Sequence, residues 1–249
     1  MRWIEAGAAL AMAAMAAGAQ QQAPPAQPPP PPAHAAPVPP IAAPVRPPQV
    51  QPPKFLVVLD AAHGGIDIGA RLEGGVAEKD VTLTLAARLR SQLRARGIDV
   101  AMIRTGDVNL APLQRAEAAN HAQAGACLTI HTTATGSGVH LFTSSLTPSE
   151  KGRFLPWETA QGAYVTQSMK LESELHAALA HTAIPVTLGR ASVAPMDSMT
   201  CPEVAVEVAP LVGGAVTSGR AVTDGSYQKQ VVDAVAAALE QWRSDWKVE

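Results

Sequence analysis

Short apolar runs alternate along the second part of the chain with longer segments whose apolar residues recur every three or four positions. Runs of about four to eight residues are typical of buried strands, and the longer period is typical of amphipathic helices. The pattern predicts strands at 55–60, 98–103, 126–131, 138–142 and 204–208. It predicts helices at 80–96, 110–124, 157–182 and 227–246. Strands that alternate with helices indicate a single α/β domain with a mostly parallel central sheet and helices on both faces.

The N-terminal segment has a different pattern, which resembles a targeting signal. Arg2 precedes an apolar, alanine-rich stretch at 6–17, and the small residues at 17–19 suit signal peptidase. The stretch is shorter than the roughly 20 residues of a transmembrane helix. We therefore interpret residues 1–19 as a signal peptide and expect an exported protein, periplasmic or located in the cell envelope.

Proline dominates the segment that follows. Fifteen of the 22 prolines lie between residues 24 and 53, among Gln and Ala, and this composition favours extended polyproline II over a packed core. The sequence therefore predicts a disordered linker at 20–53. The folded domain is expected to span 54–249, which is long enough for one hydrophobic core.

Charge and cysteine content narrow the class of protein. The formal net charge is −2 with both signs interspersed, so a basic face for nucleic acid is not expected. Cys127 and Cys201 are the only cysteines. In an oxidising compartment they can pair, but the geometry of a disulfide is demanding, so two buried free thiols are the favoured interpretation.

Three of the predicted strands end in side chains that can bind a metal or move a proton. His63 follows the first strand, His131 ends the strand at 126–131, and Glu207 follows the apolar residues 204–206. Open α/β sheets carry their chemistry at the carboxyl ends of the strands. Two imidazoles and a carboxylate at such ends are the groups of a zinc hydrolase.

A hydrolytic zinc site usually has three protein ligands, so a third ligand must be found. Glu78, just before the helix that Asp80 is predicted to cap, is the best candidate. Glu207, which its apolar segment predicts to be buried, is then left as the base. Asp60 can instead be a ligand, but a carboxylate this close to a metal histidine more often orients it. His140 is an alternative ligand. The remaining candidates are Asp67 and Glu73, which can touch substrate, and His121 and His176, which are expected at the surface.

The chain resembles the zinc-dependent N-acetylmuramoyl-L-alanine amidases of the Amidase_3 type over nearly all of residues 54–249. The likeness is carried, in the family's order, by Val57 to Gly65, Gly75 to Lys79, Ile103 to Asp107 with Arg115, Ala119 and Asn120, then Thr129 to His131, and Pro202 to Val208. The resemblance implies that His63, Glu78 and His131 bind Zn²⁺ and that Glu207 is the catalytic base. It also implies that Asp60 and Asn120 support the ligands or touch the substrate.

The implied substrate is peptidoglycan, cut between the muramoyl lactyl group and L-alanine. Three segments depart from the family pattern: Ala61-Ala62 before His63, Thr132-Thr133 after His131, and Val208 to Gly214 after Glu207. The alternatives are therefore a catalytically weak relative that binds cell wall, or a zinc hydrolase of another amide. An envelope activator protein is a possible partner, because some members of the family carry a helix that blocks the zinc until an activator removes it. The interrupted segment 146–161 does not predict a full helix of this kind. Glu150 or Glu158 in this segment can still reach the cleft. The sequence does not fix the oligomeric state.

Overall fold

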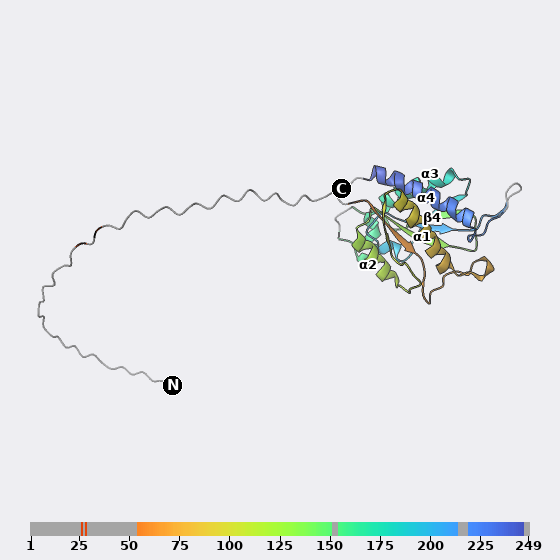
Figure 1. Ribbon diagram of the computed structural model, residues 1–249, viewed down its shortest axis with the longest axis horizontal. Helices are drawn as coiled ribbons and strands as arrows, with labels where there is room; N and C mark the ends of the chain where they lie inside the picture. The colour runs from red at the N-terminus through yellow and green to blue at the C-terminus, as the bar shows by residue number, and fades with distance from the viewer. Residues whose placement is uncertain (1–25, 27, 29–53, 151–153, 214–218, 247–249) are drawn as a thin grey trace, which may run out of the picture. The chain divides into compact units, whose positions relative to one another are not determined.

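The computed structural model describes residues 26, 28, 54–150, 154–213 and 219–246. All described helices and strands lie between residues 56 and 245 (Figure 1). The predicted signal peptide and nearly all of the predicted linker lie outside the described residues. Among the described helices, none has the length and apolar character that crossing a membrane requires.

One six-stranded sheet forms the centre of the domain, in the order β2-β1-β3-β6-β4-β5. The strands are β1 (Leu56–Ala61), β2 (Asp99–Met102), β3 (Ala126–Thr132), β4 (Val139–Ser144), β5 (Val186–Ala191) and β6 (Glu203–Val208). Four of the five neighbouring pairs are parallel, and only β4 and β6 are antiparallel. The expected mostly parallel sheet is therefore confirmed, although β5 was not expected from the sequence.

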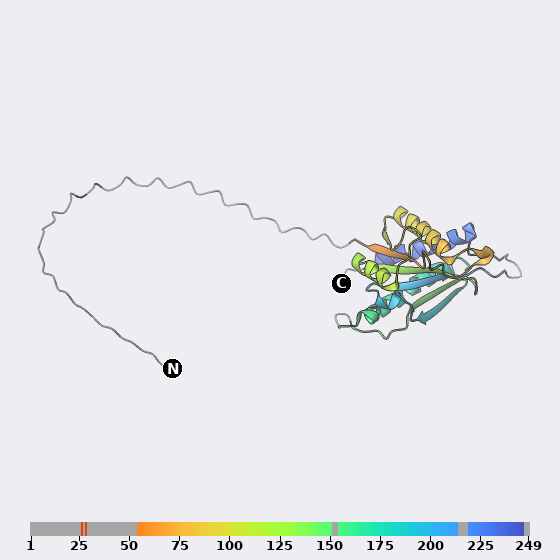
Figure 2. The same ribbon diagram turned by 90° about the horizontal axis from the view of Figure 1, so that it is seen from below.

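Helices cover both faces of this sheet, as the sequence predicts (Figure 2). The elements are α1 (Glu78–Ala95), α2 (Pro112–Ala122), α3 (Val165–Ala180) and α4 (Gly225–Asp245), with short 3₁₀ turns η1 (Glu73–Gly75), η2 (Trp157–Ala163) and η3 (Met196–Ser198). On one face α4 packs beside both α1 and α3, and together they bury the larger apolar core. On the other face α2 and η3 cover a smaller cluster around Val58 and Met199.

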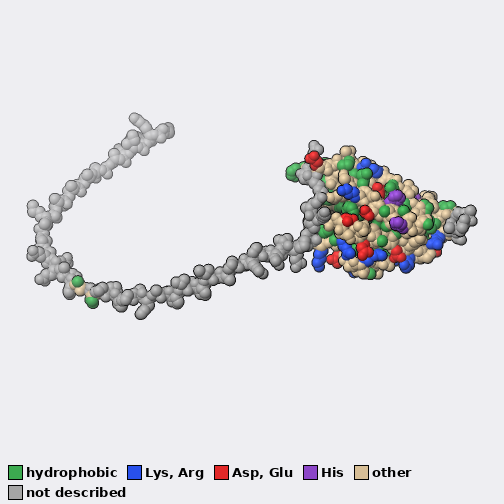
Figure 3. Space-filling view, turned by 90° about the horizontal axis from the view of Figure 1, so that it is seen from above, with side chains coloured by type: hydrophobic (Ala, Val, Ile, Leu, Met, Phe, Trp, Pro, Cys, Tyr) green, Lys and Arg blue, Asp and Glu red, His purple; other side chains and the backbone are tan. Residues whose placement is uncertain are grey.

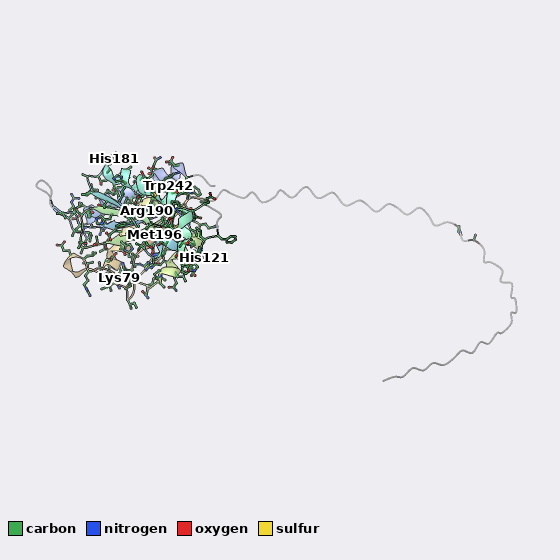
Figure 4. All side chains as sticks on the ribbon, turned by 180° about the vertical axis from the view of Figure 1, so that it is seen from behind. Lys79, His121, His181, Arg190, Met196 and Trp242 are labelled. Carbon is green, nitrogen blue, oxygen red and sulfur yellow. A yellow bond between two sulfur atoms is a disulfide. The ribbon has the colours of Figure 1, made fainter. Side chains whose placement is uncertain are left out.

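The amphipathic stripes are buried where the sequence places them. The α1 residues Val81, Leu85, Leu89 and Leu93 all lie in the larger core. Near the end of α4, Trp242 packs against the margin of that core, and its indole N–H donates to the carbonyl of Gly125 at 3.0 Å. Trp242 is labelled in Figure 4, as is His121, which is exposed on α2 as expected.

The first helix begins two residues earlier than the prediction. Asp80 does not cap it, because Ala77 has the extended backbone of an N-cap residue and the helix starts at Glu78. Asp80 lies instead in the first turn, where its negative charge complements the helix dipole. The predicted stop at Gly97 is confirmed, since its φ of 69° is the left-handed conformation that ends many helices.

The long helix predicted at 157–182 is divided in two. The 3₁₀ segment η2 comes first, and α3 begins only at Val165. The cause is Gln161, a fully buried side chain whose amide donates to the carbonyls of Met199 and Cys201, both at 3.1 Å. These bonds tie η2 to the chain just before β6, and this geometry does not continue directly into α3.

The two cysteines form a disulfide, so the favoured interpretation as free thiols was wrong. Their Cα atoms lie 6.0 Å apart, and both side chains are buried beneath α2. The reason is the strand order: Cys127 pairs with Glu203 in the β3–β6 register, which brings Cys201 beside it. The bridge therefore links the two strands that carry His131 and Glu207.

Candidate functional site

His63 lies on a turn directly after β1, at the carboxyl edge of the sheet. Its φ is 62°, and Gly64 and Gly65 follow with φ of 136° and 59°, so three successive residues have positive φ. Such a backbone is unfavourable for a histidine and must be held by its surroundings.

Two buried arginines hold that turn by its carbonyl groups. Arg115 of α2 donates to the carbonyl of His63 at 2.6 Å and to that of Ala61 at 3.0 Å. Arg104, just after β2, donates to Ala61 at 2.7 Å and to Ala62 at 3.1 Å. Every carbonyl from Ala61 to His63 therefore accepts a bond from a guanidinium group, which fixes the direction of the His63 side chain.

Glu78 brings His63 and His131 together. Its Oε2 lies 3.1 Å from His63 Nε2, and its Oε1 lies 3.0 Å from His131 Nδ1. One potential ligand atom from each of the three residues lies within 4.8 Å of the others. The glutamate is buried and both histidines are about a quarter exposed, so the cluster can be reached from solvent through the histidines. Figure 3 shows one face of the domain, on which lysine, arginine, aspartate and glutamate side chains are interspersed.

The environment of Glu78 keeps it ionised. Burial favours the neutral acid, but hydrogen bonds from His131 and His63 and from the backbone N–H groups of Ala70 and Thr132 outweigh it and lower the pKa of Glu78. The backbone bonds are 2.8 Å and 3.0 Å long. A carboxylate that is charged and fixed in direction is suited to binding a cation.

The approach of the loop to this cluster requires glycine at position 69. A Cβ added to Gly69 would lie 2.6 Å from both Glu78 Oε2 and His63 Cδ2, and its φ is 65°. Both the space and the backbone conformation therefore exclude a side chain. The glycine loop between β1 and α1 is part of the site.

The two aspartates near His63 have different roles from those the sequence indicates. Asp67, expected only to touch substrate, lies 2.9 Å from the Nδ1 of His63. Asp60, expected to orient the imidazole directly, is buried and pairs with Arg115 at 2.5 Å. Asp60 therefore reaches His63 only through the guanidinium group on the backbone carbonyl, because its side chain points to the face that α2 covers.

These contacts shift the pKa of His63 and of Asp60. The hydrogen bond to Glu78 raises the pKa of His63, burial opposes this, and Asp67 adds to the increase. Burial raises the pKa of Asp60, while the charge and hydrogen bond of Arg115 act against it. Removal of Arg115 would therefore leave Asp60 buried without its cation.

Glu207 lies beside His131 in a row that crosses three strands. His131 of β3 is the register partner of Glu207 of β6, which is in turn the partner of His140 of β4. Side chains at paired positions point to the same face and their Cβ atoms lie about 5 Å apart. Glu207 is thus next to one of the three clustered residues, and its Oε1 lies 2.8 Å from His140 Nδ1.

Asn120 does not join the cluster. Its amide donates to the carbonyl of Ser198 at 3.0 Å, and its oxygen accepts from the N–H of Thr200 at 2.7 Å. It lies near the C-terminal end of α2 and lines a cavity of about 740 Å³ with Gly125, at the end of the sheet where β3 begins. Because His131 lies at the other end of β3, Asn120 does not contact the three clustered residues, and its hydrogen bonds join α2 to the segment before β6.

The segment that follows β4 also begins away from the cluster. β4 runs antiparallel to β6, so its C-terminal end lies at the edge where β6 starts. There Ser149 donates to the carbonyl of Gly162, and Ser144 donates to Asp197. The described residues between β4 and η2 contain no helix. Glu150 and Glu158 are therefore attached at the edge opposite the histidines, and the expectation that either reaches the cleft was wrong.

The resemblance included Arg104, Arg115 and Lys79, but sequence reasoning assigned none of them a role in shaping the site. The Lys79 ammonium group donates to the carbonyl of Gly65 at 2.8 Å and to Asp107 at 2.7 Å. A signal for Arg115 was present, because Asp60 ends an apolar strand and a buried carboxylate requires a cation or a proton. The position of that cation, 55 residues further along the chain, depends on the packing of α2.

The residues present fit a zinc ion. Two imidazoles and an ionised carboxylate are a common ligand set of hydrolytic zinc sites, and His63 contacts Asp67, outside the set, which fixes its ring. A second group of potential ligand atoms, Cys127, Cys201 and Glu203, does not fit, because both sulfurs belong to the disulfide.

The fold and the site together define a family. The Amidase_3 family, described as N-acetylmuramoyl-L-alanine amidase, matches residues 57–241, and the chain belongs to it. Among curated proteins it is similar to the amidase AmiA of Salmonella typhimurium (44% identical over 78 residues, 31% of this chain) and to AmiC of Neisseria meningitidis (33% over 106 residues, 40% of this chain). The matched segments span about a quarter of those relatives, 27% and 26% respectively.

Solved amidase structures share the fold. The amidase Ami1 of Mycobacterium smegmatis has a TM-score of 0.60 at 20% identity, over 77% of this chain and 98% of that one. AmiC2 of Nostoc punctiforme has a TM-score of 0.58 at 20% identity, over 76% and 97%. At this identity the likeness concerns the architecture, which is the single α/β domain described above.

Proposed function

We propose that this protein is an exported, zinc-dependent N-acetylmuramoyl-L-alanine amidase. It hydrolyses the amide between the lactyl group of N-acetylmuramic acid and the L-alanine of peptidoglycan stem peptides, in cell-wall remodelling or daughter-cell separation. The observation that carries the proposal is the convergence of His63, Glu78 and His131, with Glu207 in the adjacent strand position. The family match over residues 57–241 supports the substrate class.

The roles of the residues follow from their chemistry. His63, Glu78 and His131 would hold the zinc ion, which as a Lewis acid activates water and polarises the amide carbonyl. Glu207 is the carboxylate placed to accept the proton of the attacking water and to pass it to the leaving amine nitrogen. Arg104 and Arg115 keep the His63 turn in place, so that the imidazole does not have to be ordered when metal and substrate bind.

The proposed location rests on the sequence. Residues 1–19 have the pattern of a signal peptide and 20–53 that of a proline-rich spacer, and the disulfide between Cys127 and Cys201 is consistent with an oxidising compartment. The mature protein would therefore meet its substrate in the periplasm or cell envelope. An envelope activator protein remains a possible partner in this proposal.

Digestion of purified peptidoglycan, followed by mass spectrometry of the products, tests the proposal. We expect free stem peptides that begin with L-alanine, together with glycans that keep an unsubstituted lactyl carboxyl group. Glu207→Gln should release none, whereas Glu117→Gln, an exposed change on α2, should act like the wild type. Binding to cell wall without release would instead indicate a catalytically weak relative, and cleavage of a different amide would indicate another zinc hydrolase.

A further inference from the structure

His140 contacts the proposed base from the neighbouring strand. It lies on β4 opposite Glu207 of β6, and its Nδ1 is 2.8 Å from Glu207 Oε1. In its role as the proposed base Glu207 is a carboxylate and can only accept hydrogen bonds, so in that role the imidazole donates from Nδ1. His140 is 18% exposed and Glu207 is 32% exposed, so both side chains can be reached from solvent beside His131.

The imidazole of His140 is confined by two further neighbours. A Cβ added to Gly136 would lie 2.6 Å from His140 Cε1, so the loop after β3 passes close to the ring edge. On the same strand face, Phe142 presents its ring at a centroid distance of 6.5 Å and an interplanar angle of 79°. A ring held on these sides has little freedom to turn, and its N–H group therefore has a fixed direction.

His140 does not belong to the metal cluster. The described residues whose ligand atoms converge are His63, Glu78 and His131. The Nδ1 of His140 already contacts Glu207. Because β6 lies between β3 and β4, Glu207 separates His140 from His131. The sequence-based alternative in which His140 replaces a ligand is thus not the arrangement that the structure favours.

We propose that His140 is a positioning residue for Glu207, and this rests on the proposed amidase function. Glutamate has several rotatable bonds, and a partly exposed one normally samples several rotamers. The bond from His140 holds Oε1 and thereby fixes the direction of Oε2, the oxygen left to exchange a proton with water and with the leaving amine. The role requires an N–H donor at this position and no metal contact.

Two substitutions distinguish the contribution of the N–H donor of His140 from that of its aromatic ring. His140→Phe keeps an aromatic ring against Gly136 and Phe142 but has no donor, whereas His140→Asn places an amide N–H close to the position of Nδ1. We expect His140→Phe to lower kcat about 10- to 100-fold with KM changed less than about twofold, and His140→Asn to recover most of the loss. His176→Phe, an exposed change on α3, is the matched control.

The measurements are kcat and KM on a defined muropeptide, zinc content by elemental analysis, and the thermal midpoint of each variant. A His140→Phe protein with normal zinc content and wild-type kcat would overturn the proposal, as would a His140→Asn protein as impaired as His140→Phe. A loss of kcat that only follows a loss of zinc or of folded protein would also overturn it. If the wild type itself cleaves no muropeptide, the proposed function fails. If the wild type is active and His140→Phe keeps its activity, only the role of His140 fails.

Discussion

Arg115 joins Asp60 to His63: its guanidinium group lies 2.5 Å from the Asp60 carboxylate and 2.6 Å from the backbone carbonyl of His63. The pair is buried, and it connects the core beneath α2 to the turn that carries a proposed zinc ligand. A buried ion pair of this kind contributes more to the direction of the turn than to net stability, because its desolvation offsets much of the attraction.

Removing only one of the two partners should therefore destabilise the protein more than its contribution to the intact pair suggests. We expect Arg115→Met to lower the free energy of unfolding by about 3–5 kcal/mol, because Asp60 is left without its cation, and to weaken zinc binding. In the double variant with Asp60→Asn the penalty should be clearly smaller than the sum of the two single ones. Urea unfolding of the four proteins gives the coupling free energy, and strictly additive effects would contradict the role of this pair.

Gly69 offers a test of the site geometry that leaves the proposed ligands unchanged. Gly69→Ala would push a methyl group against Glu78 and His63, so we expect zinc affinity to fall about 10- to 100-fold. Calorimetric titration of the metal-free protein with zinc measures the effect.

Gly74→Ala is the matched control for backbone strain. Its φ of 75° is close to the 65° of Gly69, but a Cβ at Gly74 meets nothing within 4 Å. This variant should lose some stability while keeping its zinc affinity. Equal affinities for the two variants would show that the loop does not shape the metal site.

The cluster of His63, Glu78 and His131 could be predicted from the sequence to a large extent, because parallel strands bring their carboxyl ends to one edge. His63, His131 and Glu207 each end an apolar run, and that is where the structure places them. The exact start of α1 could not be predicted, since it depends on the backbone of Ala77, although the glutamate itself was identified.

Other features were not visible for definite physical reasons. Strand β5 is an edge strand without a buried residue, so its sequence has no apolar run to detect. The antiparallel direction of β4 moved the segment after it away from the site, and direction is not encoded in an apolar pattern. The disulfide depends on the β3–β6 register, a contact between segments 74 residues apart.

Glu203 should make stability depend on pH. Its side chain is fully buried, and burial raises the pKa of Glu203 from 4.5 to about 8, with the Thr129 hydrogen bond opposing and the charge of Asp60 adding. The folded protein therefore keeps this proton up to about pH 8, whereas the unfolded chain releases it near pH 4.5. The contribution of this group is thus greatest below pH 4.5 and is lost as the pH rises towards 8.

We expect this loss to amount to about 2–4 kcal/mol of unfolding free energy in the wild type. Glu203→Gln cannot ionise, so its stability should change less across the same pH range. The exposed Glu117→Gln serves as control. Denaturant unfolding at pH 5, 6.5 and 8 checks the slope, and a Glu203→Gln protein with the wild-type slope would contradict the assignment.

The disulfide should stabilise the domain without taking part in the chemistry. It closes a loop of 74 residues, and a cross-link of this length restricts the unfolded chain by about 2–4 kcal/mol. We expect Cys127→Ala with Cys201→Ala to lower the thermal midpoint by several degrees. At a temperature where the variant is folded, kcat on muropeptides should be unchanged, and a selective loss of kcat would assign the bridge a further role.

The central claim is that His63, Glu78 and His131 hold one zinc ion that the amidase activity requires. The direct measurement is a titration of the metal-free protein with zinc, in which bound metal and muropeptide cleavage are followed together. We predict that activity rises in proportion to bound zinc and saturates at one equivalent, and that Glu78→Gln and His131→Ala lose both. Full activity in the metal-free protein, or stoichiometric zinc binding by both variants, would contradict the account.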